Sequence, residues 1–183
     1  ELYDRITRRK AIESLGRRKD KRAIPALVDV LHCSDTEAVI NSIYALIRIN
    51  WDPTEEDREL LLSLLDGECT QVRAVIQAHT RLGIKHLKAE KAIYELCDHE
   101  HALIAGAARA YQAKIYGKSH LLDQLETQLS NLTAGKRRSA VIDLGDARDP
   151  SRIATLVQAP ISMSLRANSC FQIINHQHPQ QQQ

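Results

Sequence analysis

Several polar side chains recur at helical spacing and could together bind an anionic ligand. Arg73, Gln77 and Arg81 are four residues apart, so in a helix they would lie on one side. Tyr44 and Arg48 have the same spacing. Guanidinium groups bind carboxylates and phosphates through paired hydrogen bonds. We therefore predict a polar stripe with an aromatic ring beside it, able to hold carboxylate or phosphate groups.

The stretch that must position part of this stripe is residues 71–83, QVRAVIQAHTRLG. Its apolar residues recur every three or four positions, from Val72 through Val75 and Ile76 to Leu82. That period predicts an amphipathic helix, with His79 on the same apolar face. Gly83 follows where a glycine commonly ends a helix.

The same pattern recurs along the chain. Six copies are spaced 31 to 34 residues apart, and they begin at Arg5, Val39, Val72, Leu103, Ala134 and Leu165. One aligned position reads Ala11, Ala45, Ala78, Arg109, Ala140 and Phe171. Three copies end in Leu-Gly, at Gly16, Gly83 and Gly145. A fixed period in this range is typical of a helical repeat array.

A second set of helices is expected between these repeat helices, at residues 21–32, 54–66, 86–97, 119–131 and 150–158. Asp20, Thr54 and Asp149 are placed to cap three of them. Short connections between helices make neighbours antiparallel, and hairpins that bury apolar faces stack into a solenoid. We predict an all-α solenoid of about five to six HEAT-like hairpins in one domain, residues 1–175, and a disordered polar tail at 176–183.

Composition narrows the class of protein. Hydrophobic residues make up 43% of the chain and aromatic residues 4%, which suits closely packed helices with aliphatic cores. No stretch is long and apolar enough to span a membrane, and no secretory leader is visible. The four cysteines are scattered without C-x-x-C pairing, so we expect free thiols in a reducing compartment, the cytoplasm or a plastid stroma.

Charge is uneven along the chain. Residues 1–22 carry nine Lys and Arg, whereas residues 52–68 carry seven Asp and Glu. A nucleic-acid-binding array, such as the alkyl-base DNA glycosylases of this fold class, needs a continuous basic groove and aromatic residues. The acidic block and the few aromatics argue against that function.

The repeats resemble those of the HEAT family. The resemblance rests on VRAVIQAHTRLG and LRANSCFQI, which follow the hydrophobic-Arg opening of the second HEAT helix, and on DKRAIPALVDVLHCSD with its proline. In HEAT solenoids the second helices usually line the concave face. The outward side chains there would include Tyr44 and Gln77 in one column, and Arg48, Arg81 and Asp143 in another.

Each of these positions has a structural alternative. The Arg at the second position of the helix, Arg73 here, commonly pairs with an acid of the next repeat. Arg109 falls in a column of small residues, so either the helix is rotated there or the charge is half-buried and paired. Asp143 could accept ligand N–H groups, or it could be a solvated helix residue.

The segment APISMSLRANSCFQI, residues 159–173, and the length of the array resemble the E/F-type phycobilin lyases. Members of that family attach linear tetrapyrroles to cysteines of phycobiliproteins, often as a pair of related chains. The resemblance implies a bilin substrate and no cofactor. Its partners would be a phycobiliprotein subunit and a second HEAT-repeat chain or another copy of this one.

In that interpretation, the propionates of the bilin would bind Arg48, Arg73 and Arg81. Asp143 would meet pyrrole N–H groups, and Tyr44 and Trp51 would cover the ring edges. The nucleophile, a thiolate, comes from the acceptor protein, so the lyase acts mainly by positioning. No catalytic residue is assigned in this chain. The alternative is a non-enzymatic HEAT scaffold or chaperone that binds a phycobiliprotein or another protein.

A metal site is not expected. His99-Glu100 resembles the iron-binding dipeptide of the deoxyhypusine hydroxylases, which repeat it in four places. The equivalent points here read Thr36-Glu37, Cys69-Thr70 and Ser162-Met163, so the ligand set is incomplete. His79 and His86 are isolated histidines that we expect in the core or at the surface.

Overall fold

The computed structural model describes residues 2–131 and 133–177. Its regular elements within these ranges are helices. The chain divides into two compact units, Glu1–Lys88 and Ala89–Gln183, which are described separately here. The division falls inside one helix, α6 (Leu87–Glu95).

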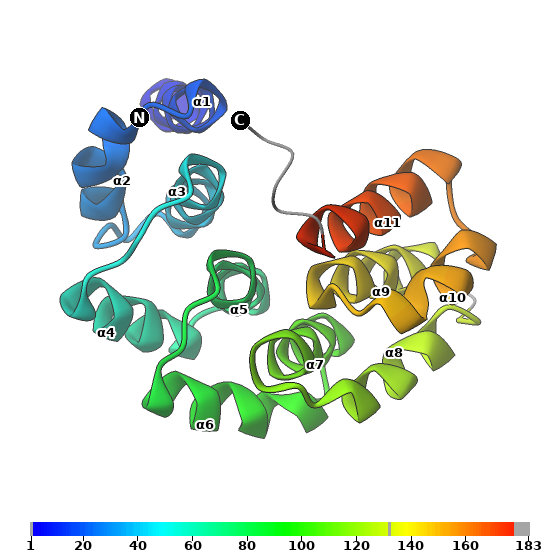
Figure 1. The fold of residues 1–183 in the computed structure, drawn as a ribbon. Helices are drawn as coiled ribbons and strands as arrows, with labels where there is room; N and C mark the ends of the chain where they lie inside the picture. Colours follow the sequence, from blue (N-terminus) through cyan, green and yellow to red (C-terminus); the bar gives the residue numbers. More distant parts are fainter. Residues whose placement is uncertain (1, 132, 178–183) are drawn as a thin grey trace. The chain divides into compact units, whose positions relative to one another are not determined.

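Unit 1 contains three repeat helices, α1 (Leu2–Arg18), α3 (Thr36–Ile49) and α5 (Cys69–Leu82). They pack on one another in chain order. On their other side lie the short helices η1 (Lys21–Ala23), α2 (Ile24–Val30), α4 (Glu55–Ser63) and η2 (Leu64–Asp66) (Figure 1). The core of the unit is aliphatic and includes Leu27, Ile43, Leu46 and Leu61.

Unit 2 repeats this arrangement with α7 (Ala102–Tyr116), α9 (Ala134–Ala147) and α11 (Met163–Gln177). The shorter elements beside them are the rest of α6, η3 (Leu96–Asp98), η4 (Ser119–Leu122), α8 (Asp123–Gln128), η5 (Pro150–Arg152) and α10 (Ile153–Gln158). Its core is built from Leu122, Leu125, Leu144, Leu156 and Ile173. The intervening helices are thus shorter than expected, because a 3₁₀ turn forms part of each predicted range.

The helix ends follow from local chemistry. Asp20, Thr54 and Asp149 each accept a hydrogen bond from a backbone N–H of the helix that follows, as the sequence predicts. Thr54 forms a complete capping box with Asp57. Gly83 ends α5 with a positive φ of 71°, which glycine adopts without steric cost.

The other two Leu-Gly pairs have a different role. Gly16 and Gly145 lie inside α1 and α9, which continue to Arg18 and Ala147. A Cβ added to Gly16 would stand 2.8 Å from the Cα of Ala45 on α3. A Cβ added to Gly145 would stand 2.8 Å from the Cβ of Ser169 on α11. These glycines therefore let neighbouring repeat helices approach closely; they do not end helices.

This contact corrects the register of the last repeat. Gly145 meets Ser169 as Gly16 meets Ala45, so Ser169 occupies the alanine position of the repeat. The sequence alignment placed Phe171 there, yet Phe171 is 63% exposed and Ser169 only 4%. The hydroxyl of Ser169 also donates to the carbonyl oxygen of Val141, 3.0 Å away on α9. The last two repeats are therefore two residues closer in sequence than the motif alignment indicated.

The predicted fold class, an all-α solenoid of HEAT-like hairpins, is confirmed. Helix α11 extends to Gln177, two residues into the predicted tail. Residues 178–183 lie outside the described ranges, so the disordered tail stays a prediction, as does the single domain at 1–175. Across the part of the chain that the structure describes, none of the helices has the length and apolar character needed to cross a membrane.

Candidate functional site

The predicted polar stripe exists on α3 and α5 in unit 1. The hydroxyl of Tyr44 donates a hydrogen bond to Oε1 of Gln77, at 2.7 Å. The two residues occupy the same position of consecutive repeats, so the bond joins the two helices at the column where the sequence placed them. Tyr44 is half-buried and Gln77 is buried.

The three arginines of the stripe differ in exposure. Arg48 lies in the last turn of α3 and is exposed. Arg81, in the last turn of α5, is half-buried, and Arg73 is only 9% exposed. Arg48 is therefore the guanidinium that solvent and a ligand reach most readily, and the burial of Arg73 fits the structural alternative considered for it.

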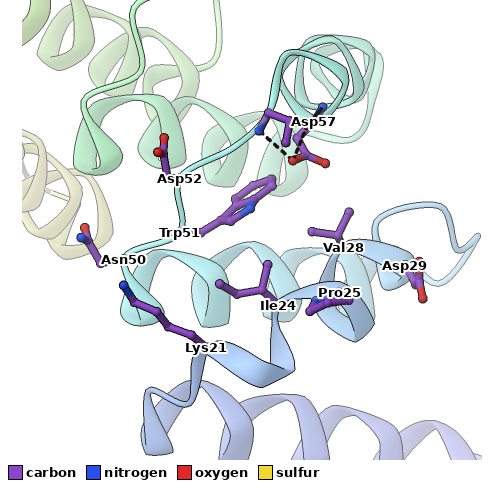
Figure 2. Close-up of a pocket in the computed structure, with 10 residues that line it drawn as sticks. Lys21, Ile24, Pro25, Val28, Asp29, Asn50, Trp51, Asp52 and Asp57 are labelled. Atoms are coloured by element: carbon purple, nitrogen blue, oxygen red, sulfur yellow. Dashed lines mark hydrogen bonds between the residues drawn. The ribbon is translucent and has the colours of Figure 1, made fainter.

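Trp51 lies in the loop between α3 and α4 and lines a pocket of about 560 Å³. Figure 2 shows its indole beside Ile24, Pro25 and Val28 of α2. The residues that line this pocket include none of the polar side chains of the stripe. Trp51 is also buried in the core of unit 1. At this pocket, then, the structure does not bring Trp51 together with Tyr44, its predicted companion.

The charged residues at this pocket are mostly acidic. Asp29, Asp52 and Asp57 line it together with Lys21. Asp57 is held by the capping box: its Oδ2 accepts from the backbone N–H and the hydroxyl of Thr54, both at 2.8 Å (Figure 2). An acidic rim repels propionates and phosphates, so this pocket does not suit the anionic ligand predicted for the stripe.

Asp143 in unit 2 is buried, with 1% of its surface exposed. It lies on α9 against α7, because a Cβ added to Gly106 would stand 2.5 Å from its Oδ2. The alternative of a solvated helix residue is therefore wrong for Asp143. Only glycine at position 106 leaves room for this carboxylate, and that pairing of a glycine with a distant acid is not visible in sequence.

Arg109 is half-buried on α7 and lies 3.6 Å from the carboxylate of Asp98. Of the alternatives considered for this charge in a column of small residues, half-burial with pairing is confirmed. Asp98 itself is almost fully exposed, so the pair lies at the surface and contributes little to stability. Arg138, which raised the same question, is exposed.

One polar group in unit 2 was not predicted. Lys118 donates to Oε1 of Gln112 at 2.9 Å, and its ammonium lies 4.3 Å from the centre of the Tyr94 ring. Gln112 in turn donates to the carbonyl oxygen of Glu90. Lys118 follows the end of α7, outside the repeat columns, which is why the periodic alignment overlooked it.

The histidines behave as structural groups. His79 is fully buried, and its Nδ1 lies 2.9 Å from the carbonyl oxygen of Val75. Burial lowers the pKa of His79 to about 4, so the ring is neutral at pH 7 and Nδ1 donates to that carbonyl. His99 Nδ1 accepts from the backbone N–H of His101. Neither histidine is arranged as a metal ligand.

Glu55, Glu59 and His86 are the residues within the described ranges whose ligand atoms cluster within 4.8 Å of one another. His86 Nε2 lies 3.2 Å from Glu55, and the ammonium of Lys88 lies 2.6 Å from Glu59. The lysine already neutralises one carboxylate, so the group forms a surface ion-pair network. The absence of a resident metal stays a prediction.

The four cysteines are free thiols, as predicted. Cys33 is exposed and Cys97 is buried. Burial raises the pKa of Cys97 to about 11, which keeps this thiol protonated and unreactive at neutral pH. No described cysteine lies in an environment that lowers its pKa.

Comparison with known proteins supports the predicted resemblance. The family model of HEAT repeats matches residues 2–80. The chain is 30% identical over 166 residues to "Uncharacterized phycocyanin operon protein Y" of Pseudanabaena tenuis, covering 91% of this chain and 39% of that protein. It is 26% identical over 163 residues to the bilin biosynthesis protein PecE of Nostoc sp., covering 87% of this chain and 62% of that protein.

A solved structure has the same fold. A chain in the complex of CpcE and CpcF of phycocyanin lyase from Nostoc sp. matches with a TM-score of 0.80 at 20% identity, covering 93% of this chain and 67% of that chain. The sequence spans less than two thirds of the length of the two curated relatives. Residues 2–80 are therefore HEAT repeats, and the chain is a relative of the phycocyanin-operon and bilin-biosynthesis proteins.

Proposed function

We propose that this chain is a phycobilin lyase or a subunit of one. It would bind a linear tetrapyrrole and position it for thioether attachment to a cysteine of a phycobiliprotein. The observation that carries the proposal is the sequence similarity to a bilin biosynthesis protein over 87% of the chain. A fold alone would not assign an activity.

The chemistry needs little from the lyase beyond binding and orientation. The acceptor cysteine adds across the carbon–carbon double bond of the bilin's ethylidene group. A carbon–sulfur bond forms, the thiol proton ends on the tetrapyrrole, and nothing is oxidised or reduced. A protein that holds both reactants in contact converts a bimolecular step into an intramolecular one. This explains why no catalytic motif is required.

The stripe on α3 and α5 is the candidate bilin-binding surface in unit 1. Exposed Arg48 and half-buried Arg81 supply guanidinium groups for the two propionates. The Tyr44 ring, held by its bond to Gln77, offers an edge for the flat tetrapyrrole. We keep Arg73, Trp51, Arg109 and Asp143 as predicted contacts. Arg73 and Asp143 are buried, so ligand contact there requires side chains to move.

The test is co-expression with candidate phycobiliprotein subunits in a bacterial host that makes bilins, with and without a related lyase chain. Covalent bilin is detected by zinc-enhanced fluorescence of the acceptor on a denaturing gel. Labelling that depends on this chain supports the proposal. If no acceptor is labelled but one co-purifies with this chain, the scaffold or chaperone function replaces it.

A matched pair of variants tests the site. Arg48 and Arg18 both lie in the last turn of a repeat helix and are exposed, so reversing either charge has the same cost against the helix dipole. We expect Arg48→Glu to lower labelling at least about tenfold, the scale of one lost charged contact. Arg18→Glu should label as the wild type does. Equal activity of the two variants would remove Arg48 from the site.

A further inference from the structure

The outer face of α11 leaves a set of apolar side chains exposed. Phe171 is 63% exposed and Ile174 is 49% exposed, and Met163 is also exposed. The three lie eight and three residues apart, so they share one side of the helix. Large apolar residues grouped on one helix face indicate a contact surface more often than single exposed ones do.

The corrected register identifies which face this is. Gly16 and Gly145 are the points where α1 and α9 receive the following repeat helix. Each glycine lies five residues after the small-residue position of its own helix, at Ala11 and Ala140. Five residues after Ser169, the matching position in α11 is Ile174. Ile174 thus lies where another repeat helix would pack.

The residue three positions earlier supports the same assignment. In α3 and α9 that position holds Ile47 and Ile142, which are half-buried, and Ile47 packs against the core of unit 1. In α11 it holds Phe171. The side of the repeat that is used for packing in the earlier helices is therefore apolar and uncovered in α11.

Charge indicates what kind of helix covers it. Helix α11 carries Arg166 and no acid, whereas α1 carries Arg and Lys at six positions along its length. A second copy of this chain stacked head-to-tail would bring the basic α1 against a face that offers no carboxylate. A helix with small, uncharged residues, like the surfaces at Ala45 and Ser169, fits the face better.

We propose that the α11 face, defined by Met163, Phe171 and Ile174, binds a repeat helix of a second, related HEAT-repeat chain. The second chain would continue the stack by the contact that joins α9 to α11. This proposal rests on the proposed function as a lyase subunit, and it assigns that partner a surface.

The experiment uses the full chain with purified CpcE and CpcF of Nostoc sp. as the two probes, each titrated separately by sedimentation velocity. The test variant is Phe171→Asp/Ile174→Asp. The control is Tyr3→Asp/Leu87→Asp, which places the same charges at apolar residues that are 80% and 81% exposed in unit 1. Circular dichroism confirms that each variant folds. If the Asp variant does not fold, Phe171→Ala/Ile174→Ala replaces it.

We expect one probe to bind the wild type, the α11 variant to bind at least about tenfold more weakly, and the control to bind as the wild type does. Hydrogen exchange of α11 should slow in the complex. The proposal is overturned if neither probe binds, if the α11 variant binds normally, or if the wild type forms a homodimer through this face. Wild-type bilin labelling without a second chain would refute the inference and leave the lyase function standing.

Discussion

The Tyr44 hydroxyl and the Gln77 amide oxygen are joined by a 2.7 Å hydrogen bond between equivalent positions of α3 and α5. The bond links two adjacent repeats directly through the column that the sequence placed at the ligand-binding surface. It therefore ties the orientation of the aromatic ring to the packing of the repeats.

The strength of this bond can be measured with a double-mutant cycle of Tyr44→Phe and Gln77→Leu. Each single change removes one partner, and a neutral hydrogen bond contributes about 0.5–1.5 kcal/mol to the free energy of unfolding. We expect a coupling energy of about 1 kcal/mol by urea denaturation. Strictly additive effects would show that the bond does not couple the repeats.

Close packing of the repeat helices predicts opposite results for two glycines. Gly16→Ala places a methyl group 2.8 Å from the backbone of Ala45, and relieving that overlap should lower the free energy of unfolding by about 1–3 kcal/mol. Gly135 has no atom within 4 Å of an added Cβ, so Gly135→Ala should raise it by up to about 1 kcal/mol through helix propensity.

Thermal and urea unfolding of both variants check this prediction, and Gly135→Ala serves as the control for the loss of backbone freedom. If Gly16→Ala proved as stable as the wild type, α1 would not lie as close to α3 as the structure places it.

The buried His79 predicts a loss of stability in mild acid. Burial lowers its pKa in the folded protein to about 4, below the usual 6.5, so the unfolded chain takes up the proton first. Stability is complete above about pH 6.5 and falls toward pH 4, by on the order of 3 kcal/mol from this residue. Urea unfolding at pH 7.5, 6, 5 and 4 measures the effect.

The comparison is with His79→Leu and with His120→Gln, since His120 is exposed. His79→Leu should be less stable at pH 7.5 because the replacement fits the site poorly, but its stability should fall less below pH 6.5. His120→Gln should follow the wild type. Parallel pH profiles for wild type and His79→Leu would contradict the assignment.

The thiols should separate by reactivity. Exposed Cys33 should react with iodoacetamide in the folded protein. Cys97 should stay unmodified at pH 8, because burial both blocks access and raises its pKa to about 11. Peptide mapping by mass spectrometry after a timed reaction distinguishes the two. Cys33→Ser should remove the early adduct, and modification of Cys97 before unfolding would show that unit 2 opens locally.

Local signals in the sequence determined the elements of this protein. Asp20, Thr54 and Asp149 were identified as caps because a cap bonds to backbone groups two or three residues away. The repeat period and the apolar faces placed the repeat helices, since both depend on side chains within one helix. The pairing of Tyr44 with Gln77 followed from the period alone.

The tertiary structure decided what those helices do with their faces. Arg48 and Asp143 share one repeat position, yet Arg48 is exposed and Asp143 is buried against Gly106. Motif spacing assigned Phe171 to the alanine position, but the approach of Gly145 selects Ser169. In each case the outcome depends on which side chain of a neighbouring helix leaves room, and this contact joins residues about 25 to 40 positions apart that no local pattern relates.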